Sequence, residues 1–444
     1  MDTYKQIQQL DSLVSTINNL LADSTVAEWH SAVLFEAKSA FSQIQQKAVI
    51  SLKENLLDRM IEQLADVERE IHLSLEPPLN SLCRLVEENN LSPDLKSQLL
   101  IQVGKTYDIL GQWNQALDIF TKSLDFCTDG TVYRAEIIKY LGHIKSKLRE
   151  YSSATKLYLD SLAIYTTLQN KHEIGNIYLC QGYNDFEQGN YGQAEDYYQL
   201  ALKLATAEED NQLIADCNNN LGIMATVKGV LDDAITYYQK AISGYESIGD
   251  IPGRATTYHN QAMLKVDMEN WKDAGESYQR ALEYAQQAGN LELMGLIQLN
   301  RAELAIKLYD YTMAKACCDH ALAVFGRLSS HTRVAEAYKF LGRVASQQKR
   351  WDEAKNLFEI SVQINYAAQN PLGIAETRYE YGLMYLSQGL KDNAKQQFTQ
   401  ALKLFDKLGA SLDMHKVKAE LEKLEEGKED KASKLKRIVR IQRG

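Results

Sequence analysis

Three asparagines recur at an interval of 40 residues, at Asn220, Asn260 and Asn300. An asparagine amide both donates and accepts hydrogen bonds, so a row of amides can bind the main chain of an extended peptide. Asparagine is a mediocre helix former and gains little from a helical position. The spacing therefore predicts a peptide-binding surface. Two alternatives stay open, since duplicated units can retain an asparagine without a ligand, and an amide can also bond between neighbouring helices.

Ligand-type residues for a metal stand together in Cys317-Cys318-Asp319-His320. Adjacent cysteines on a helix point about 100° apart, which suits a tetrahedral metal site poorly. The sequence has no glycine-rich phosphate loop, no His-Glu-x-x-His motif and no Cys-x-x-Cys motif. We therefore expect no catalytic residue, no metal and no cofactor, and we expect that the protein is not an enzyme.

A repeated alanine indicates which elements hold the asparagines. It recurs at Ala116, Ala154, Ala194, Ala234, Ala274, Ala314, Ala354 and Ala394. The residue four positions later is aromatic in seven of the eight copies, and the residue twelve positions earlier is glycine or alanine. Steps of three, four and seven place residues on one helical face. Small residues let two helices approach where they cross, and aromatic rings fill the space beside them. The repeated unit is therefore a helix–turn–helix.

The clearest copy of this unit runs from Asn220-Leu221-Gly222 to Ala241-Ile242. It resembles the tetratricopeptide repeat in a lengthened 40-residue form, similar to the Pins/LGN adaptors, kinesin light chain and several bacterial regulators. The resemblance implies an all-α, right-handed superhelical solenoid of eight units over residues 97–410. It also implies that the first helix of each unit lines an inner groove.

The register of the repeat predicts which side chains share this groove. With the repeated alanine as position 20, positions 2, 5, 6, 9, 12 and 13 should face inward. Beside the three asparagines, the expected groove residues are Asn219, His259, Met263, Asp267, Glu303 and Lys307. Upstream, the first two repeats should be more basic because of Lys105, Lys139, His143 and Lys147. Downstream, Glu336, Lys339, Arg343 and Glu376 mix charges of both signs.

The N-terminal segment, residues 1–76, lacks the repeat signature. Apolar residues step by three and four in two runs, at Ile7, Leu10, Val14, Ile17 and Leu21, and at Leu57, Met60, Leu64, Val67 and Ile71. This spacing predicts either a helical bundle packed on the first repeat or a surface for self-association. Pro77-Pro78 should end the segment, and a connecting helix and loop should fill residues 77–96.

The C-terminal end follows the last repeat as a capping helix and a basic tail. Residues 411–427 should form the cap, with Leu412, Val417, Leu421 and Leu424 on its apolar face. The tail, residues 428–444, carries six lysines and arginines between 431 and 443 and no acid in that stretch. It is expected either to be solvated or to dock on an acidic partner, on nucleic acid or on a membrane surface.

Composition excludes several classes of protein. The net charge of −10 over 444 residues disfavours general nucleic-acid binding by the body of the chain. No stretch approaches 18 consecutive apolar residues, and no signal-peptide pattern opens the chain. The six cysteines show no disulfide spacing, which is typical of a reducing compartment. We therefore expect a cytoplasmic protein without a membrane span.

These features favour a scaffold or adaptor that binds a partner peptide or protein in the groove, with no small-molecule substrate. The first alternative is a bacterial peptide-sensing regulator of the tetratricopeptide type, whose N-terminal helices act on a response regulator or transcription factor. The second alternative is a structural homo-oligomer assembled through residues 1–76.

Overall fold

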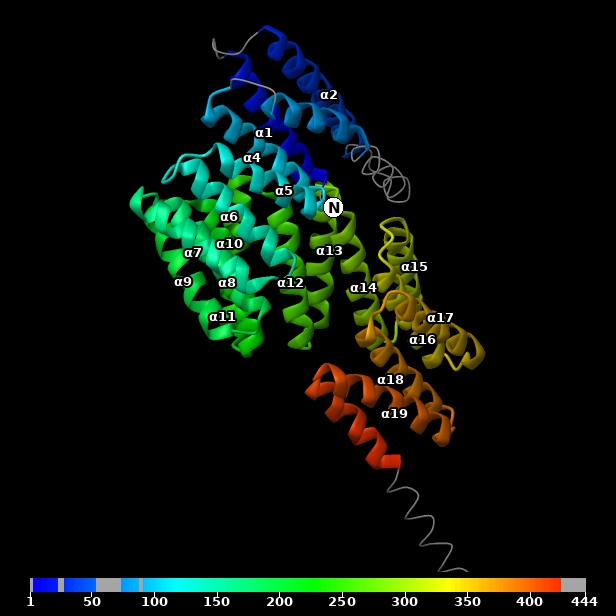
Figure 1. Cartoon of the computed structure of the whole chain (residues 1–444). Helices are drawn as coiled ribbons and strands as arrows, with labels where there is room; N and C mark the ends of the chain where they lie inside the picture. The colour runs from blue at the N-terminus through cyan, green and yellow to red at the C-terminus, as the bar shows by residue number, and fades with distance from the viewer. Residues whose placement is uncertain (1–2, 23–27, 53–72, 88–90, 425–444) are drawn as a thin grey trace, which may run out of the picture. The chain divides into compact units, whose positions relative to one another are not determined.

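The computed structural model describes residues 3–22, 28–52, 73–87 and 91–424 (Figure 1). It divides into two compact units, Met1–Leu293 and Met294–Gly444, which are treated separately below. The second heptad run (57–71) and the basic tail (431–443) lie outside the described residues, so the predictions for them stay predictions.

The described chain is all-α, as the sequence predicts. Two long helices, α1 (Thr3–Ala22) and α2 (Glu28–Leu52), and a helix over residues 73–87 precede a series of helix pairs. The pairs are α4 (Pro93–Ile109) with α5 (Trp113–Ser123) and the short η1 (Leu124–Phe126), α6 (Val132–Lys147) with α7 (Tyr151–Thr167), α8 (Lys171–Glu187) with α9 (Tyr191–Ala207), α10 (Asn211–Lys228) with α11 (Leu231–Ile248), α12 (Ile251–Asp267) with α13 (Trp271–Ala288), α14 (Leu291–Lys307) with α15 (Tyr311–Arg327), α16 (His331–Gln347) with α17 (Trp351–Ala367), and α18 (Pro371–Ser387) with α19 (Lys391–Leu408).

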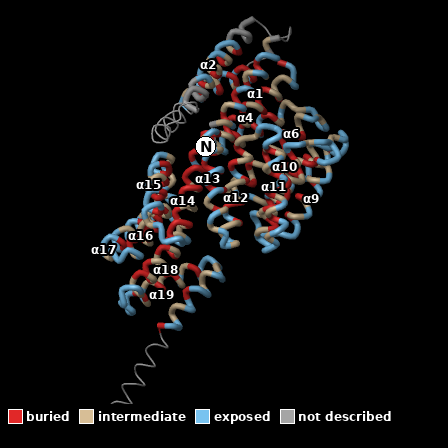
Figure 2. The backbone as a smooth tube through the Cα atoms, turned by 180° about the vertical axis from the view of Figure 1, so that it is seen from behind, coloured by how far each residue is buried: buried red, intermediate tan, exposed pale blue. Residues whose placement is uncertain are grey.

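The small and aromatic residues of the repeat meet inside the helix pairs that carry a glycine at the repeated position. A Cβ atom added at Gly142 would lie 2.8 Å from the ring of Tyr158, and one added at Gly222 would lie 2.6 Å from the ring of Tyr238. The tyrosines are buried, and Figure 2 shows buried residues along the seams between helices. Each glycine therefore allows the close approach of two helices that the aromatic ring then fills.

The connections between pairs contain a residue in the left-handed conformation followed by a helix-capping residue, at turns that the sequence predicts. Gly249 and Gln369 adopt φ values of 71° and 51°, in the left-handed region that ends a helix. The next residue then caps the following helix, since Asp250 Oδ1 accepts from the Gly253 N–H at 3.0 Å. This capping satisfies a backbone donor that the first turn of a helix leaves unpaired.

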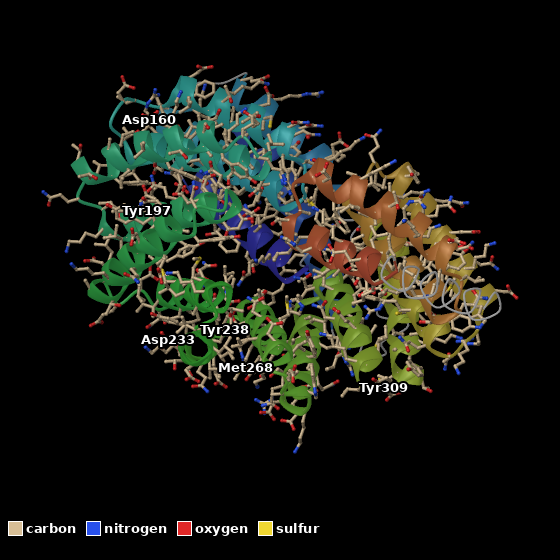
Figure 3. The ribbon with its side chains drawn as sticks, turned by 90° about the horizontal axis from the view of Figure 1, so that it is seen from below. Asp160, Tyr197, Asp233, Tyr238, Met268 and Tyr309 are labelled. Atoms are coloured by element: carbon tan, nitrogen blue, oxygen red, sulfur yellow. The ribbon has the colours of Figure 1, made fainter. Side chains whose placement is uncertain are left out.

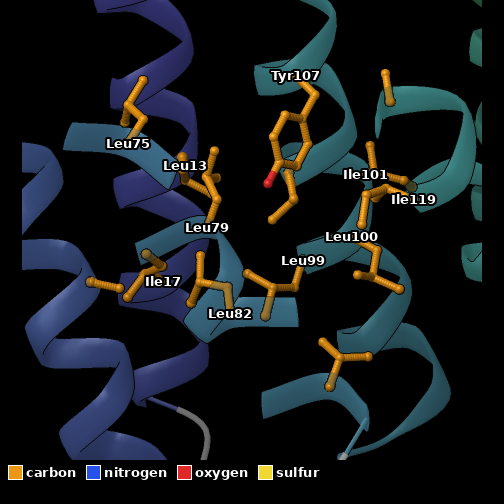
Figure 4. Close-up of a cluster of buried hydrophobic side chains, with 14 of the residues drawn as sticks. Leu13, Ile17, Leu75, Leu79, Leu82, Leu99, Leu100, Ile101, Tyr107 and Ile119 are labelled. Carbon is orange, nitrogen blue, oxygen red and sulfur yellow. The ribbon is translucent and has the colours of Figure 1, made fainter. Parts of the chain in front are cut away.

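The N-terminal helices pack against the first repeat. Leu13 and Ile17 of α1, Leu79 and Leu82 of the helix over 73–87, and Leu99 of α4 are fully buried in one cluster (Figure 4). This packing matches the bundle predicted for the segment, whereas self-association remains a prediction.

The helix over residues 73–87 differs from expectation because it contains Pro77 and Pro78. The proline pair therefore does not mark the end of the N-terminal helical segment. Each proline removes a backbone donor, but Leu75 and Leu79 on either side are buried in the cluster. Burial of two leucines contributes about 3–6 kcal/mol, which offsets part of the roughly 3 kcal/mol that each proline costs in a helix interior.

A helix over residues 411–424 covers the end of the last repeat. Val417 and Leu424 are buried against Phe398 and Phe405 of α19, as a capping helix requires. Leu412 is 76% exposed, so its expected place on the apolar face is wrong. It lies in the first turn of this helix, ahead of the residues that reach the core.

Candidate functional site

A polar cavity of about 630 Å³ lies within the first unit, between α1, α10 and the junction of α11 with α12. Its walls carry Lys5, Gln8 and Gln9 from α1, Gln212, Asp216 and Asn219 from α10, Tyr245 from α11, Thr256 from α12, and Asp250 from the junction of α11 with α12. Figure 3 shows α1, the dark blue ribbon, inside the curve of the helices of this unit. The N-terminal helix therefore forms one wall of a cavity whose other walls include residues of α10, α11 and α12.

The hydrogen-bonded carboxylate of Asp216 lines this cavity. Tyr245 donates its hydroxyl to Asp216 Oδ1 at 2.6 Å, and Gln212 Nε2 lies 3.3 Å from the same oxygen. Gln212 Nε2 also donates to Asp250 Oδ2 at 3.1 Å. Burial raises the pKa of Asp216, while the two hydrogen bonds and the charge of Lys5 oppose that shift. The arrangement suits a cationic group or an N–H donor brought by a ligand.

Asn219 presents its amide to the same cavity. Its Oδ1 accepts from Thr257 Oγ1 at 3.1 Å and from Asn260 Nδ2 at 3.2 Å, both on α12. Its NH₂ group makes no hydrogen bond to any described residue, and the side chain lines the cavity. Asn219 is thus oriented by the next repeat while its donor remains available for a carbonyl oxygen.

The predicted asparagines have unequal surroundings. Asn260 donates a hydrogen bond to Asn219. This is the bond between neighbouring helices that the sequence left open as an alternative. Asn220 is half-buried and makes no hydrogen bond within the described part of the chain. Asn300 is half-buried in α14, whose residues from Met294 onward belong to the second unit.

Apart from Asn219, none of the predicted groove residues lines this cavity, and the three asparagines at the 40-residue interval are among those that do not. His259 is half-buried with its ring 6.1 Å from that of Tyr278, and burial lowers its pKa to about 4. Met263 and Asp267 are exposed on α12. In the second unit, Glu303 lines another cavity, while Lys307 is exposed at the end of α14. The role of each as a ligand contact stays a prediction.

The basic residues expected in the first two repeats are balanced by carboxylates. Lys105 pairs with Glu136 at 2.7 Å, and Lys139 pairs with Glu173 at 2.5 Å. Lys147 pairs with Asp108 at 2.6 Å. Each pair joins the first helices of successive repeats. These lysines therefore connect repeats and do not form the free basic surface that the sequence suggested.

His143 adds no positive charge to this part of the groove. Its Nε2 lies 3.6 Å from Asp108 Oδ2. Burial, reinforced by the charge of Lys147, lowers the pKa of His143 to about 4. The ring is therefore neutral near pH 7.

Sequence reasoning missed the contribution of α1 to the site. Gln9 Nε2 donates to the Gln102 carbonyl oxygen at 3.1 Å and holds α1 against α4. Gln6 and Gln9 are only 2% and 8% exposed, so polar residues lie on the buried side of this helix. The two glutamines stand next to the apolar residues Ile7 and Leu10 in the sequence, and this position could have predicted that they face the interior. Asp216 and Thr256 both precede the repeated alanine by 18 residues, an inward position that the register does identify.

The described residues offer little to metal or thiol chemistry. None of them form a cluster of three histidine, cysteine or acidic side chains placed to bind a metal ion. Burial raises the pKa of Cys318 to about 12, so this thiol stays protonated at neutral pH. Among the same residues, no helix has the length and apolar character required to cross a bilayer.

Comparison with known families identifies the repeat. Models described as "Tetratricopeptide repeat" match residues 173–247, 214–287, 293–367 and 375–407. The chain is a tetratricopeptide repeat protein. The matches begin at residue 173, so the full number of eight repeats stays a prediction.

One curated protein is similar to this chain in sequence. It is 21% identical over 212 residues to the transcriptional activator NprA of Geobacillus stearothermophilus, covering 46% of this chain and 51% of the activator. The chain thus spans about half the length of that curated relative.

Solved structures share the fold at low sequence identity. The apo form of the quorum sensor NprR from B. thuringiensis has a TM-score of 0.55 at 16% identity, over 80% of this chain and 97% of that one. A Rap protein complexed with competence and sporulation factor has a TM-score of 0.50 at 13% identity, over 80% and 99%. A signal transduction ATPase from Pyrococcus horikoshii with a tetratricopeptide repeat sensor has a TM-score of 0.54 at 14% identity, over 76% and 55%.

Proposed function

We propose that this chain is a non-enzymatic adaptor that binds an extended peptide, free or within a partner protein, in the cavity of its first unit. One observation carries the proposal: Thr257 and Asn260 hold the Asn219 amide through its oxygen, and this side chain, whose NH₂ group has no hydrogen bond to a described residue, lines a polar cavity. A peptide carbonyl would accept from Asn219, and a basic side chain or amino terminus would pair with Asp216. We also propose that the protein acts in the cytoplasm.

Selection from a displayed library tests the proposal without knowledge of the natural ligand. The full chain is immobilised and a random heptapeptide phage library is selected against it. The bound pool is then tested on a variant carrying Asp216→Asn and Asn219→Ala, and on Asp233→Asn as a control of equal charge change. Asp233 is exposed on α11 and lines no part of the cavity (Figure 3).

The expected result is enrichment of a peptide family that the double variant loses and Asp233→Asn retains. Circular dichroism should show similar helix content in all three proteins. Absence of enrichment, or equal binding to the double variant, would refute the proposed site.

A second candidate function is favoured because α1 supplies a wall of the same cavity. A peptide bound there would touch both the repeats and the N-terminal helices, as a peptide-sensing regulator requires. Relatives described as a quorum sensor, a transcriptional activator and a Rap protein complexed with competence and sporulation factor are consistent with this candidate. The N-terminal helices would then act on a response regulator or transcription factor.

Hydrogen exchange separates these two functions. With a selected peptide bound, a regulator should change amide protection throughout α1 and α2, whereas an adaptor should change it only beside the cavity. Light scattering over a concentration series tests the third candidate, a homo-oligomer assembled through residues 1–76. A constant monomer mass would exclude assembly over that range.

A further inference from the structure

The second unit contains a cavity of about 310 Å³ between α14, α16, α18 and the helix over residues 411–424. Five carboxylates line it, from Glu303, Glu336, Glu376, Glu380 and Asp413. Three cations, Lys339, Arg343 and Lys416, also line it, and Arg333 outside the lining pairs with Glu336 at 2.8 Å, so one carboxylate is in excess. The cavity therefore favours a ligand that brings positive charge.

Two of the carboxylates are incompletely paired. Arg343 lies 3.9 Å from Glu303 Oε1 and 3.5 Å from Glu380 Oε2. Charge-assisted N–H···O bonds are about 2.7–2.9 Å long, so both carboxylates retain capacity to accept a donor. Neither accepts a hydrogen bond from any residue in the described part of the chain. Lys339, by contrast, lies 2.6 Å from Glu376.

The surroundings of Glu380 show that the local cations do not fully compensate its charge. Burial raises the pKa of this carboxyl even though Arg343 and Lys339 act to lower it. An added cation beside Glu380 would stabilise the ionised form. The negative charge of the cavity is thus not fully compensated, and an ammonium or guanidinium group bound there would compensate it.

We propose that the occupant of this cavity is the basic tail of the same chain, residues 431–443. Lys431, Lys434, Lys436, Arg437, Arg440 and Arg443 supply six positive charges without an acid among them. The tail is thus complementary in charge to the cavity, and it belongs to the segment that directly follows the helix forming one wall. Docking in cis has a high effective concentration, in the millimolar range for a short flexible linker.

The chain is long enough for the tail to return to the cavity. Val417 lines the cavity, and the described helix continues seven residues further, about 10 Å at the helical rise. The seven residues from 424 to Lys431 span up to about 25 Å when extended. Even the first basic residue therefore reaches back past Val417.

A competition experiment on full-length proteins tests the proposal. The probe is a fluorescent synthetic peptide of residues 428–444, and binding is read by anisotropy in 50 mM and 300 mM NaCl. The proteins are the natural chain, a tail variant with all six basic residues changed to glutamine, and the tail variant with Glu303→Gln and Glu380→Gln. A matched control is the tail variant with Glu353→Gln and Glu359→Gln, two exposed carboxylates of α17.

The tail variant should bind the probe at least tenfold more tightly than the natural chain, whose own tail occupies the cavity. High salt and the Glu303/Glu380 changes should abolish binding, while the α17 control retains it. If that double variant fails to fold, Asp413→Asn in the tail variant replaces it, since Asp413 lines the same cavity with a half-exposed side chain.

Equal binding to the natural chain and the tail variant would overturn the proposal, as would binding that survives the cavity changes. Binding of the natural chain to anionic vesicles or to nucleic acid, with no probe binding to the tail variant, would assign the tail to an external surface instead. None of these readouts depends on the cavity of the first unit, so failure here leaves the proposed function standing.

Discussion

Replacement of Gly182 by alanine tests the close helix contact on which each repeat depends. The new Cβ would lie 2.5 Å from Cε1 and 2.6 Å from Cδ1 of Tyr198, whose ring is buried. Carbon atoms prefer a separation of about 3.5–4.0 Å, so the ring or the helix must move by about 1 Å. Such overpacking costs about 1–3 kcal/mol. The gain in helix propensity from glycine to alanine is about 1 kcal/mol. We therefore expect Gly182→Ala to be neutral or to destabilise by up to about 2 kcal/mol.

Gly275→Ala is the matched control, because a Cβ added there meets no atom within 4 Å. It should stabilise the protein by about 0.5–1 kcal/mol through helix propensity alone. The difference between the two variants isolates the cost of the crossing at Tyr198. Urea unfolding followed by circular dichroism measures both, and hydrogen exchange in α8 and α9 localises the effect in case the repeats unfold separately. Equal stabilisation by both substitutions would refute the packing argument.

Three further predictions concern charge and capping. The pKa of His259 is lowered to about 4, below the unfolded value of about 6.5, so the free energy of unfolding falls as the pH drops between these values. Urea unfolding at pH 7.5 and at pH 4.5 measures this loss, and His259→Gln should reduce it by about 1–2 kcal/mol. Glu376→Gln deprives the nearly buried Lys339 of its 2.6 Å partner and should cost about 1–3 kcal/mol by the same assay, whereas an unchanged midpoint would show that the pair contributes nothing. Asn370→Ala removes a cap on the Gly373 N–H and should lower stability by about 1 kcal/mol, while Ser330→Ala, whose side chain makes no cap bond, should not.

The packing inside the repeats could be predicted almost completely from the sequence. Gly222 and Tyr238 are 16 residues apart in one copy and recur at the same spacing in others, so one register describes many contacts. A helical pair packs through a periodic face, and periodicity is a property of the sequence alone. The same register identified Asn219 as an inward residue.

The charged residues of the groove could not be interpreted in this way. Lys139 appeared as a basic feature because its carboxylate partner, Glu173, lies 34 residues away on another helix. Such a pair depends on the stacking of successive repeats and on the reach of long side chains, neither of which has a periodic signature. Asn260 likewise contacts Asn219 across two helices.

The sequence by itself determined the helix–turn–helix unit and its all-α fold, because these follow from spacing along a single helix or between the two helices of a pair. The tertiary structure alone decided that α1 forms a wall of the Asp216 and Asn219 cavity and that the groove lysines are paired. The physical reason is that these features join residues that are distant in sequence. Their contacts are selected by burial and charge in three dimensions, so no local pattern specifies them.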